Sequence, residues 1–236
     1  MFGVTHEEIA KLVAAVDYSD ALTIVAGEAE VREACRVAAK YRLRSVAAFP
    51  QWVPVMADAL KGTGVLTMIA VGFPCGGQTS RVKCVETEEG LAAGANDLDM
   101  VMNIAAFKSR DYRKVSADIA AVQAVARPFK VPFKVIIEIG ALTEEEIVTA
   151  AKLVADSGAD FVKTCTGFGP GRASVHAIGM INEAVGKRIR IKASGGVPNI
   201  EDGVAMMRAG ASVVAMRKVL DAQLTAIGWK PAGAAR

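Results

Sequence analysis

Eight short apolar runs rich in Val and Ile recur along the 236-residue chain, and they limit its fold more than any other feature. Each run is apolar almost throughout rather than alternating with polar residues, which is typical of parallel strands that are covered on both faces. The runs are 13–17, 45–49, 66–71, 98–102, 134–138, 160–164, 189–193 and 213–216.

The segments between these runs carry apolar residues at helical spacing, and several end in the glycine expected just past a helix. Thr143 with Glu146 forms a capping-box pattern, and Asn199 stands before another helix start. Eight strand-then-helix units without a Pro/Gly/Ser-rich linker predict one (β/α)₈ barrel, a TIM barrel, over residues 1–236. A doubly wound open sheet is the alternative.

Composition excludes several classes of partner. The net charge of +3 is spread along the chain and only 6% of residues are aromatic, so no platform for nucleic acid is visible. The four cysteines are scattered, which favours reduced thiols over a zinc site or a disulfide framework. No apolar segment is long enough to span a membrane, and we expect a cytoplasmic protein that binds a small molecule.

Five ionisable residues lie at the carboxyl ends of otherwise apolar predicted strands, where a barrel of this kind carries its reactive groups. They are Asp17, Asp99, Glu138, Lys163 and Lys192. The two lysines lie on consecutive strands, about 4.8 Å apart in a sheet. Mutual repulsion and partial burial both disfavour the protonated amine, so one lysine should have a lowered pKa.

A neutral lysine attacks a carbonyl to form a Schiff base, whose iminium allows adjacent C–C bonds to form or break. Asp99 could then move protons at the site. The alternative is structural: lysines at strand ends often reach solvent, and Asp99 with Lys192 could be a simple ion pair. Spacing alone does not say which lysine is the nucleophile.

Glycine-rich loops follow both lysines, GFGPG after Lys163 and SGG, residues 194–196, after Lys192. Backbone N–H groups in such loops can approach an anion, although glycines also simply form turns. His6 and His176 are far apart in the sequence, so we expect no histidine-based metal site.

The segments DFVKTCTGFG, IKASGGV, GANDLDMVMNI and VGFPCGGQTSRVKCVETEEGLAAGA, with KVIIE before LTEEEI, closely resemble the deoxyribose-phosphate aldolases. That resemblance runs from about Val13 to Gly210 and implies a class I aldolase on a (β/α)₈ barrel. It implies reversible cleavage of 2-deoxyribose 5-phosphate to acetaldehyde and glyceraldehyde 3-phosphate, with neither metal nor organic cofactor. It also implies that Lys163 forms the Schiff base, that Lys192 lowers its pKa, and that Asp99 relays protons.

The substrate-binding edges differ from the family pattern. Near the N-terminus Asp17 and a hydroxyl at Ser19 are kept, but Tyr18 is unusual, and Phe49 replaces a polar position. The glycine and serine pair that hold the phosphate in the family become 215–218, AMRK, and Pro198 replaces an arginine. The expected substrate-binding residues are Asp17, Ser19, Thr166, Gly167, Gly195, Gly196 and Arg217.

These differences leave two alternatives open. A relative could act on another sugar phosphate, an unphosphorylated aldehyde or a carboxylate-bearing substrate, or the barrel could bind a sugar phosphate without catalysis. Arg217 and Lys218 could grip an anion or could begin the last helix as exposed cations. We also expect self-association into a homo-oligomer, although the sequence does not identify an interface.

Overall fold

All eight apolar runs contribute a strand, and the strands pair in parallel and in sequence order around a closed barrel. This computed structural model describes residues 3–231. The strands are β1 (Val16–Tyr18), β2 (Ser45–Ala48), β3 (Leu66–Val71), β4 (Asp97–Val101), β5 (Phe133–Ile136), β6 (Phe161–Lys163), β7 (Arg190–Ala193) and β8 (Val213–Met216).

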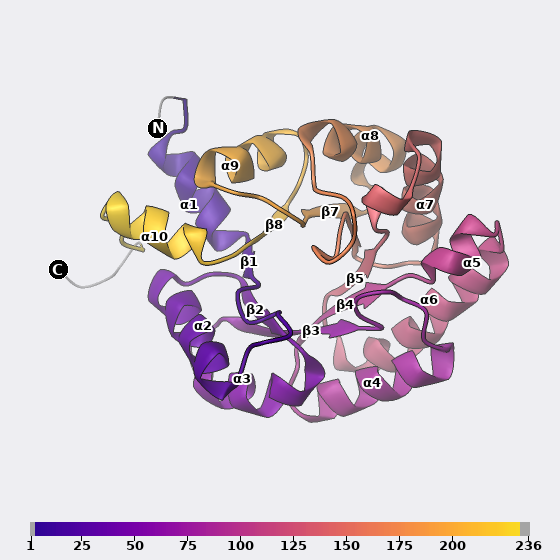
Figure 1. The fold of residues 1–236 in the computed structure, drawn as a ribbon, viewed down its shortest axis with the longest axis horizontal. Coiled ribbons are helices and arrows are strands. Elements are labelled where there is room, and N and C mark those ends of the chain that lie inside the picture. The colour runs from indigo at the N-terminus through magenta and orange to yellow at the C-terminus, as the bar shows by residue number, and fades with distance from the viewer. Residues whose placement is uncertain (1–2, 232–236) are drawn as a thin grey trace.

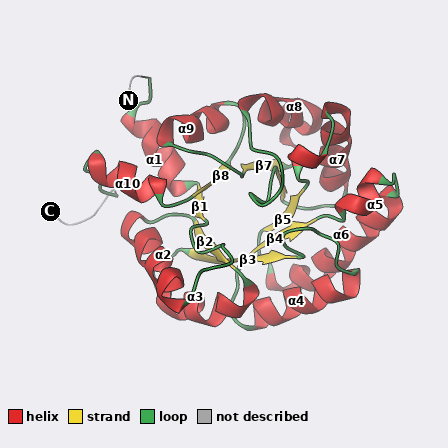
Figure 2. Cartoon of the chain, viewed as in Figure 1, coloured by secondary structure: helices red, strands yellow, loops and turns green. Residues whose placement is uncertain are grey.

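Helices form a ring outside the strands, one or more after each strand and one before the first (Figures 1 and 2). They are α1 (His6–Ala14), α2 (Glu28–Tyr41), α3 (Val53–Ala59), α4 (Ser80–Ala92), α5 (Ile104–Lys108), α6 (Tyr112–Ala126), α7 (Glu144–Asp156), α8 (Val175–Val185), α9 (Ile200–Arg208) and α10 (Val219–Ala226). None of the helices in the described part of the chain is both long and apolar enough to cross a membrane.

Pairing between β1 and β8 closes the barrel, with Asp17 opposite Ala215. The predicted (β/α)₈ barrel is therefore confirmed, and the open sheet is excluded because its edge strands would stay unpaired. A single domain over 1–236 stays a prediction, since residues 1–2 and 232–236 lie outside the described residues.

The predicted start of the first strand is wrong. Val13 lies in α1, which runs to Ala14 and buries Ile9, Leu12 and Val13 on one face. Thr5 begins this helix with a capping box to Glu8, a signal that the strand-based interpretation did not use. The short helices α3 and α5 were also not predicted, because they are too short to show helical periodicity.

The helix starts predicted from capping residues are confirmed. The Thr143 hydroxyl accepts the backbone N–H of Glu146, whose carboxylate accepts the N–H of Thr143 in return. Asn199 accepts the N–H of Asp202 at the start of α9. These bonds fix where α7 and α9 begin, and so fix the lengths of the loops after β5 and β7.

Two apolar clusters fill the molecule. The larger one lies between strands and helices. The smaller one combines the strand residues Ala47, Met68, Ala70, Val101 and Ile136 with Leu22 and Phe73 from loops after strands. Charged side chains with at most 2% exposure occupy the rest of the barrel's interior. They are Asp17, Asp97, Asp99, Lys134, Lys163 and Lys192.

Candidate active site

Lys163 and Lys192 lie directly opposite each other on β6 and β7, as their consecutive strands predict. Both amines contact the same carboxylate oxygen, Asp99 Oδ2, at 2.7 Å from Lys163 Nζ and 2.6 Å from Lys192 Nζ. The sulfur of Met68 lies 3.3 Å from Lys192 Nζ. One carboxylate thus links the two lysines that the sequence singled out.

A second carboxylate, Asp17, holds Lys192 from the other side, with its Oδ2 2.5 Å from Lys192 Nζ. The other oxygen of Asp17 accepts the Ser45 hydroxyl at 2.6 Å and lies 2.5 Å from Arg44 Nη1. The same Arg44 nitrogen is 2.6 Å from Asp97 Oδ2. Arg44 therefore bridges two buried carboxylates, and its side chain is 16% exposed.

Lys134 on β5 completes the arrangement. Its amine forms an ion pair with Asp97 and lies 3.0 Å from Asp99 Oδ1. Anions and cations therefore alternate around a closed ring inside the barrel. We call this the charge ring, and its members are Asp17, Arg44, Asp97, Lys134, Asp99 and Lys192.

Counting charges within the barrel indicates which lysine gives up its proton more readily. The charge ring pairs three carboxylates with three cations, so a protonated Lys163 would add an uncompensated buried charge. Burial, together with the charge of Lys192, lowers the pKa of Lys163 to about 8 despite the opposing pull of Asp99. Burial also disfavours the charge on Lys192, but Asp17, Asp99 and Asp97 outweigh it and raise the pKa of that amine.

Both carboxylates that flank Lys192 are held in their charged form. Burial alone would favour their neutral form, but Lys134, Lys163 and Lys192 lower the pKa of Asp99 well below its usual range. The pKa of Asp17 is also lowered, since Lys192, Lys134 and Arg44 outweigh its burial. Asp99 is therefore an acceptor poised between two amines of different pKa.

Asp17 was expected to bind substrate, but in the structure it lies inside the barrel among charged residues. It has no exposed surface, and its two oxygens face Arg44, Ser45 and Lys192. Its contact with Lys192 makes it part of the amine's environment, and it does not line the cavity described next.

Sequence reasoning missed Arg44, Asp97 and Lys134. Lys134 and Asp97 could have been noticed as ionisable residues at the starts of wholly buried strands, two positions before Ile136 and Asp99 on the same strand faces. Arg44 precedes its strand and resembles an ordinary surface residue in the sequence. Only the closed barrel brings its guanidinium to two carboxylates.

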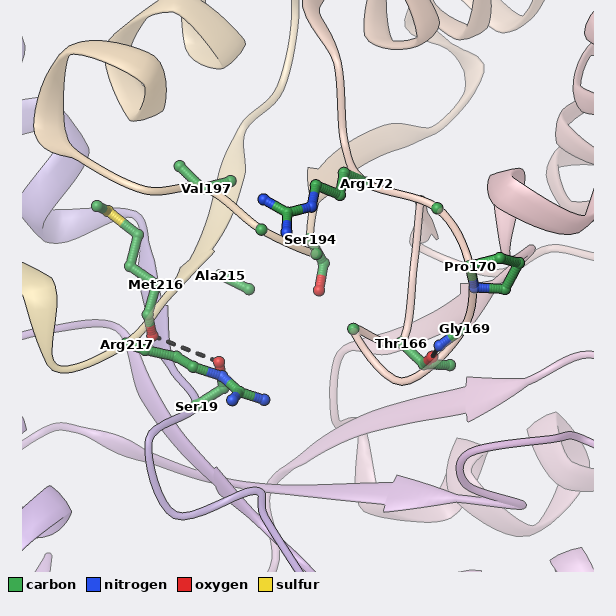
Figure 3. Close-up of a pocket in the computed structure, with 14 residues that line it drawn as sticks. Ser19, Thr166, Gly169, Pro170, Arg172, Ser194, Val197, Ala215, Met216 and Arg217 are labelled. Carbon is green, nitrogen blue, oxygen red and sulfur yellow. Dashed lines mark hydrogen bonds between the residues drawn. The ribbon is translucent and has the colours of Figure 1, made fainter.

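A cavity of about 390 Å³ opens beyond the two lysines, over the ends of β6, β7, β8 and β1 (Figure 3). Six of the seven expected substrate-binding residues line it. They are Ser19, Thr166, Gly167, Gly195, Gly196 and Arg217. Thr166 and Ser194 follow the two lysines along the chain, so the cavity lies just past the amines at the carboxyl end of the barrel.

The hydroxyl groups of Ser19 and Thr166 both form hydrogen bonds within the protein. The Ser19 hydroxyl donates to the Met216 carbonyl at 3.3 Å (Figure 3). The Thr166 hydroxyl donates to Glu138 and accepts the N–H of Phe168 at 3.0 Å and of Gly169 at 3.3 Å. Glu138 and Thr166 therefore shape the loop after β6, and Glu138 acts on this loop rather than on the lysines.

Two arginines line the cavity, and only one of them was expected. Arg172 comes from the loop after β6 and Arg217 from the end of β8, and both extend over the opening in Figure 3. Among the described residues, neither guanidinium forms an ion pair; Arg217 Nη2 contacts only the Leu22 carbonyl, at 3.5 Å. Two unpaired cations at one cavity favour an anionic ligand.

Lys218 has a different position from Arg217. Its backbone N–H donates to Asp20 Oδ1 at 3.2 Å at the start of α10, and its side chain does not line the cavity. The sequence left open whether Arg217 and Lys218 bind an anion or begin the last helix. Arg217 lines the cavity, whereas Lys218 lies at the start of α10.

Glycines form the cavity wall opposite Arg217. Gly195 has φ +100° and Gly196 has φ +71°, which favour glycine. A Cβ at Gly195 would lie 2.7 Å from Cys165 Cβ, and one at Gly196 would lie 2.9 Å from Arg172 Cδ. A side chain at Gly195 would press on the loop after β6 at Cys165, and one at Gly196 would displace the side chain of Arg172.

Three residues that depart from the family pattern, Tyr18, Phe49 and Pro198, do not line the cavity. Tyr18 is 2% exposed and belongs to the core between strands and helices, so it does not alter the cavity. Phe49 packs edge-on against Phe73, with ring centroids 6.0 Å apart, and Pro198 is exposed beside the cavity without lining it. From the altered segment 215–218, Ala215, Met216 and Arg217 do line the cavity, and Arg172 lines it as well.

Both histidines have partners outside the cavity: His6 stacks on Trp229, with centroids 4.6 Å apart, and His176 contacts Glu144 at 2.8 Å. Within residues 3–231, no three His, Cys, Asp or Glu side chains are grouped so that they could hold a metal ion.

Comparisons with known proteins agree with this geometry. The chain is 44% identical over 178 residues to a deoxyribose-phosphate aldolase of Brevibacillus brevis, covering 75% of this chain and 80% of that protein. It is 44% identical over 187 residues to the deoxyribose-phosphate aldolase of Clostridium perfringens strain 13, covering 79% and 83%.

Solved structures show the same fold. An aldolase named QR15 superposes with a TM-score of 0.86 at 29% identity, covering 92% of this chain and 97% of that one. The deoxyribose phosphate aldolase of Aeropyrum pernix, described as a tetramer, gives a TM-score of 0.83 at 23% identity over 95% and 99%. Residues 11–228 match the family described as DeoC/LacD family aldolase, and the chain therefore belongs to that family of aldolases.

Proposed function

We propose that this aldolase cleaves 2-deoxyribose 5-phosphate reversibly, through a Schiff base on Lys163, to acetaldehyde and glyceraldehyde 3-phosphate. The observation that carries the assignment of the nucleophile is the charge count inside the barrel. Every other buried amine in the cluster has two carboxylate neighbours, whereas Lys163 shares only Asp99. Lys163 is thus the amine that most readily gives up its proton.

The neutral Lys163 Nζ attacks the aldehyde carbon C1 of the substrate, and loss of water leaves a protonated imine. Removal of the proton from the C3 hydroxyl lets the C2–C3 bond break, and its electron pair passes into the imine as an enamine. The first product, glyceraldehyde 3-phosphate, carries the new carbonyl. Protonation of the enamine at C2 and addition of water release acetaldehyde and restore the amine.

In this proposal Asp99 relays protons and Lys192 acts through its positive charge. Asp99 Oδ2 contacts both amines, so a proton lost at Lys163 has an acceptor within hydrogen-bond reach. Lys192 remains protonated and stabilises Asp99 as an anion between turnovers. The positive charge of Lys192 also keeps the pKa of Lys163 low.

The cavity supports a phosphorylated substrate. Arg172 and Arg217 supply charge, and the glycine loop at Gly195 and Gly196 offers backbone that a phosphate can approach closely. Both arginines could also hold a carboxylate, so the preference has to be measured. Cleavage rates for 2-deoxyribose 5-phosphate and for 2-deoxyribose decide it, and equal kcat/KM values would remove the phosphate from the proposal.

Borohydride trapping tests the covalent step. The wild-type protein is incubated with 2-deoxyribose 5-phosphate, reduced, and mapped by peptide mass spectrometry. We expect an adduct on Lys163 that is lost in Lys163→Met and kept in Lys187→Met, which changes an exposed lysine. An adduct on Lys192 or Lys134 would reverse the assignment, and no adduct would favour a barrel that binds without catalysis.

A cytoplasmic location and self-association into a homo-oligomer stay predictions. Sedimentation velocity of the purified protein at several concentrations measures the second directly.

A further inference from the structure

Arg44 reaches the active-site charges from the amino-terminal end of the barrel, opposite the cavity. It directly precedes β2, and its backbone is held by both neighbouring strands. Its N–H donates to the Val16 carbonyl at 3.0 Å, and its carbonyl accepts the N–H of Leu66 at 2.9 Å. The side chain therefore starts from a fixed point and can extend only into the barrel or away from it.

One nitrogen of the guanidinium makes both charged contacts. Nη1 lies 2.5 Å from Asp17 Oδ1 and 2.6 Å from Asp97 Oδ2, while the Phe161 ring lies 5.8 Å from the guanidinium carbon. Asp17 and Asp97 have no exposed side-chain surface. Arg44 is thus the partner that these two buried carboxylates share.

The charge of an arginine at this point is permanent, because its guanidinium does not release a proton in a protein. Without that charge, three carboxylates would face only Lys134 and Lys192. A protonated Lys163 would then restore neutrality inside the barrel, and the nucleophile would be lost at neutral pH. The permanent charge on Arg44 removes this outcome.

We propose that Arg44 is a positioning residue that keeps Lys163 available as the free amine, by fixing one positive charge on Asp17 and Asp97 from the far end of the barrel. The inference rests on the proposed function, because it presumes Lys163 as the nucleophile. Arg44 touches neither the cavity nor Lys163, and it acts through Asp17, Asp97 and the lysines that they hold.

The groups that face these carboxylates come from every strand around them. Asp17 faces Ser45 on β2, Lys192 on β7 and Arg44. Asp97 faces Lys134 on β5 and Arg44, and its Oδ1 also accepts the N–H of Leu98. No other cation within residues 3–231 contacts either carboxylate, so the charge on Arg44 has no substitute.

Two variants separate charge from shape. Arg44→Gln keeps an N–H donor but removes the charge, and Arg44→Lys keeps the charge but changes the shape. We expect the acidic limb of the kcat/KM profile to move up by about one pH unit in Arg44→Gln and to stay near its wild-type position in Arg44→Lys. Activity of Arg44→Gln at pH 7 should fall about tenfold and recover as the pH rises.

Arg188→Gln is the matched control, because it removes a cation with an exposed carboxylate partner, Asp156, on the outside of the barrel. Its acidic limb should not move. Asp97→Asn gives a second test of opposite sign, since it removes a negative charge and should move the limb to lower pH. This variant decides the question if Arg44→Gln does not fold.

A purely structural role gives a different result. The two Arg44 variants would then lose stability and activity to similar extents at every pH, with unmoved limbs, and the proposal would be wrong. Failure of the proposed function is seen separately, in the wild-type protein, as absence of the trapped adduct on Lys163.

Discussion

Replacing Lys192 by methionine should turn the reaction into one that works only at high pH. Without Lys192, Asp17, Asp97 and Asp99 face two ring cations, Arg44 and Lys134, so a protonated Lys163 restores neutrality. We expect the pKa of Lys163 to rise from about 8 towards its ordinary value of 10.5, although burial still disfavours its charge.

The size of the effect follows from the fraction of free amine. At pH 7 an amine of pKa about 8 is roughly 9% neutral, and one of pKa 10.5 is roughly 0.03% neutral. Formation of the imine at pH 7 should therefore slow by up to roughly 300-fold, the limit set by a pKa of 10.5. The deficit should shrink about five- to sevenfold per pH unit between pH 8 and 10, because the neutral fraction of the wild-type amine approaches its limit while that of the variant is still rising.

Single-turnover trapping measures this directly. Borohydride is added at timed intervals after substrate, between pH 6 and 10, and the adduct on Lys163 is quantified by mass spectrometry. If Lys192 were the nucleophile, Lys192→Met would form no adduct at any pH. A deficit that stayed constant with pH would also refute the reasoning, because it would mean that Lys192 acts in a later step rather than on the pKa of Lys163.

Three further predictions test the cavity and the scaffold. Arg172→Ala and Arg217→Ala should each raise KM for 2-deoxyribose 5-phosphate about tenfold or more, with no effect on unphosphorylated 2-deoxyribose, as steady-state kinetics will show. Gly140→Ala would put a Cβ 2.2 Å from the backbone nitrogen of Gly171, so it should displace the Arg172 loop, raise KM and lower Tm. Lys83→Met would leave Asp118 buried without its partner at 2.6 Å, and denaturant unfolding should show a loss of about 3–5 kcal/mol.

The fold was predictable because its signal repeats in every unit. Runs of residues such as 66–71 are buried on both faces, and helix starts such as Thr143 carry their own capping partners. The boundary between α1 and β1 was not predictable from apolar residues alone. Val13 is as apolar as a strand residue, and it is buried because it lies on the inward face of α1. Capping at Thr5 was the signal that could have corrected it.

The two lysines and Asp99 were also within reach of the sequence, because neighbouring parallel strands place equivalent positions side by side. The charge ring was not predictable from the sequence, because its ion pairs join residues on different strands across the inside of the barrel. Asp17 and Arg44 contact partners on strands whose relative height depends on the stagger of the closed sheet. Apolar pattern gives the faces of strands but not this stagger.

The low pKa of Lys163, the proposed nucleophile, depends on the whole buried cluster rather than on one neighbouring residue. The three carboxylates are all needed to hold three permanent or stabilised cations, and those cations leave Lys163 as the only surplus charge. Burying seven ionisable side chains carries a desolvation penalty. Apolar residues fill other parts of the same barrel, as the smaller apolar cluster shows. The effect of this arrangement on the Lys163 amine gives a reason for burying so many charges in one barrel.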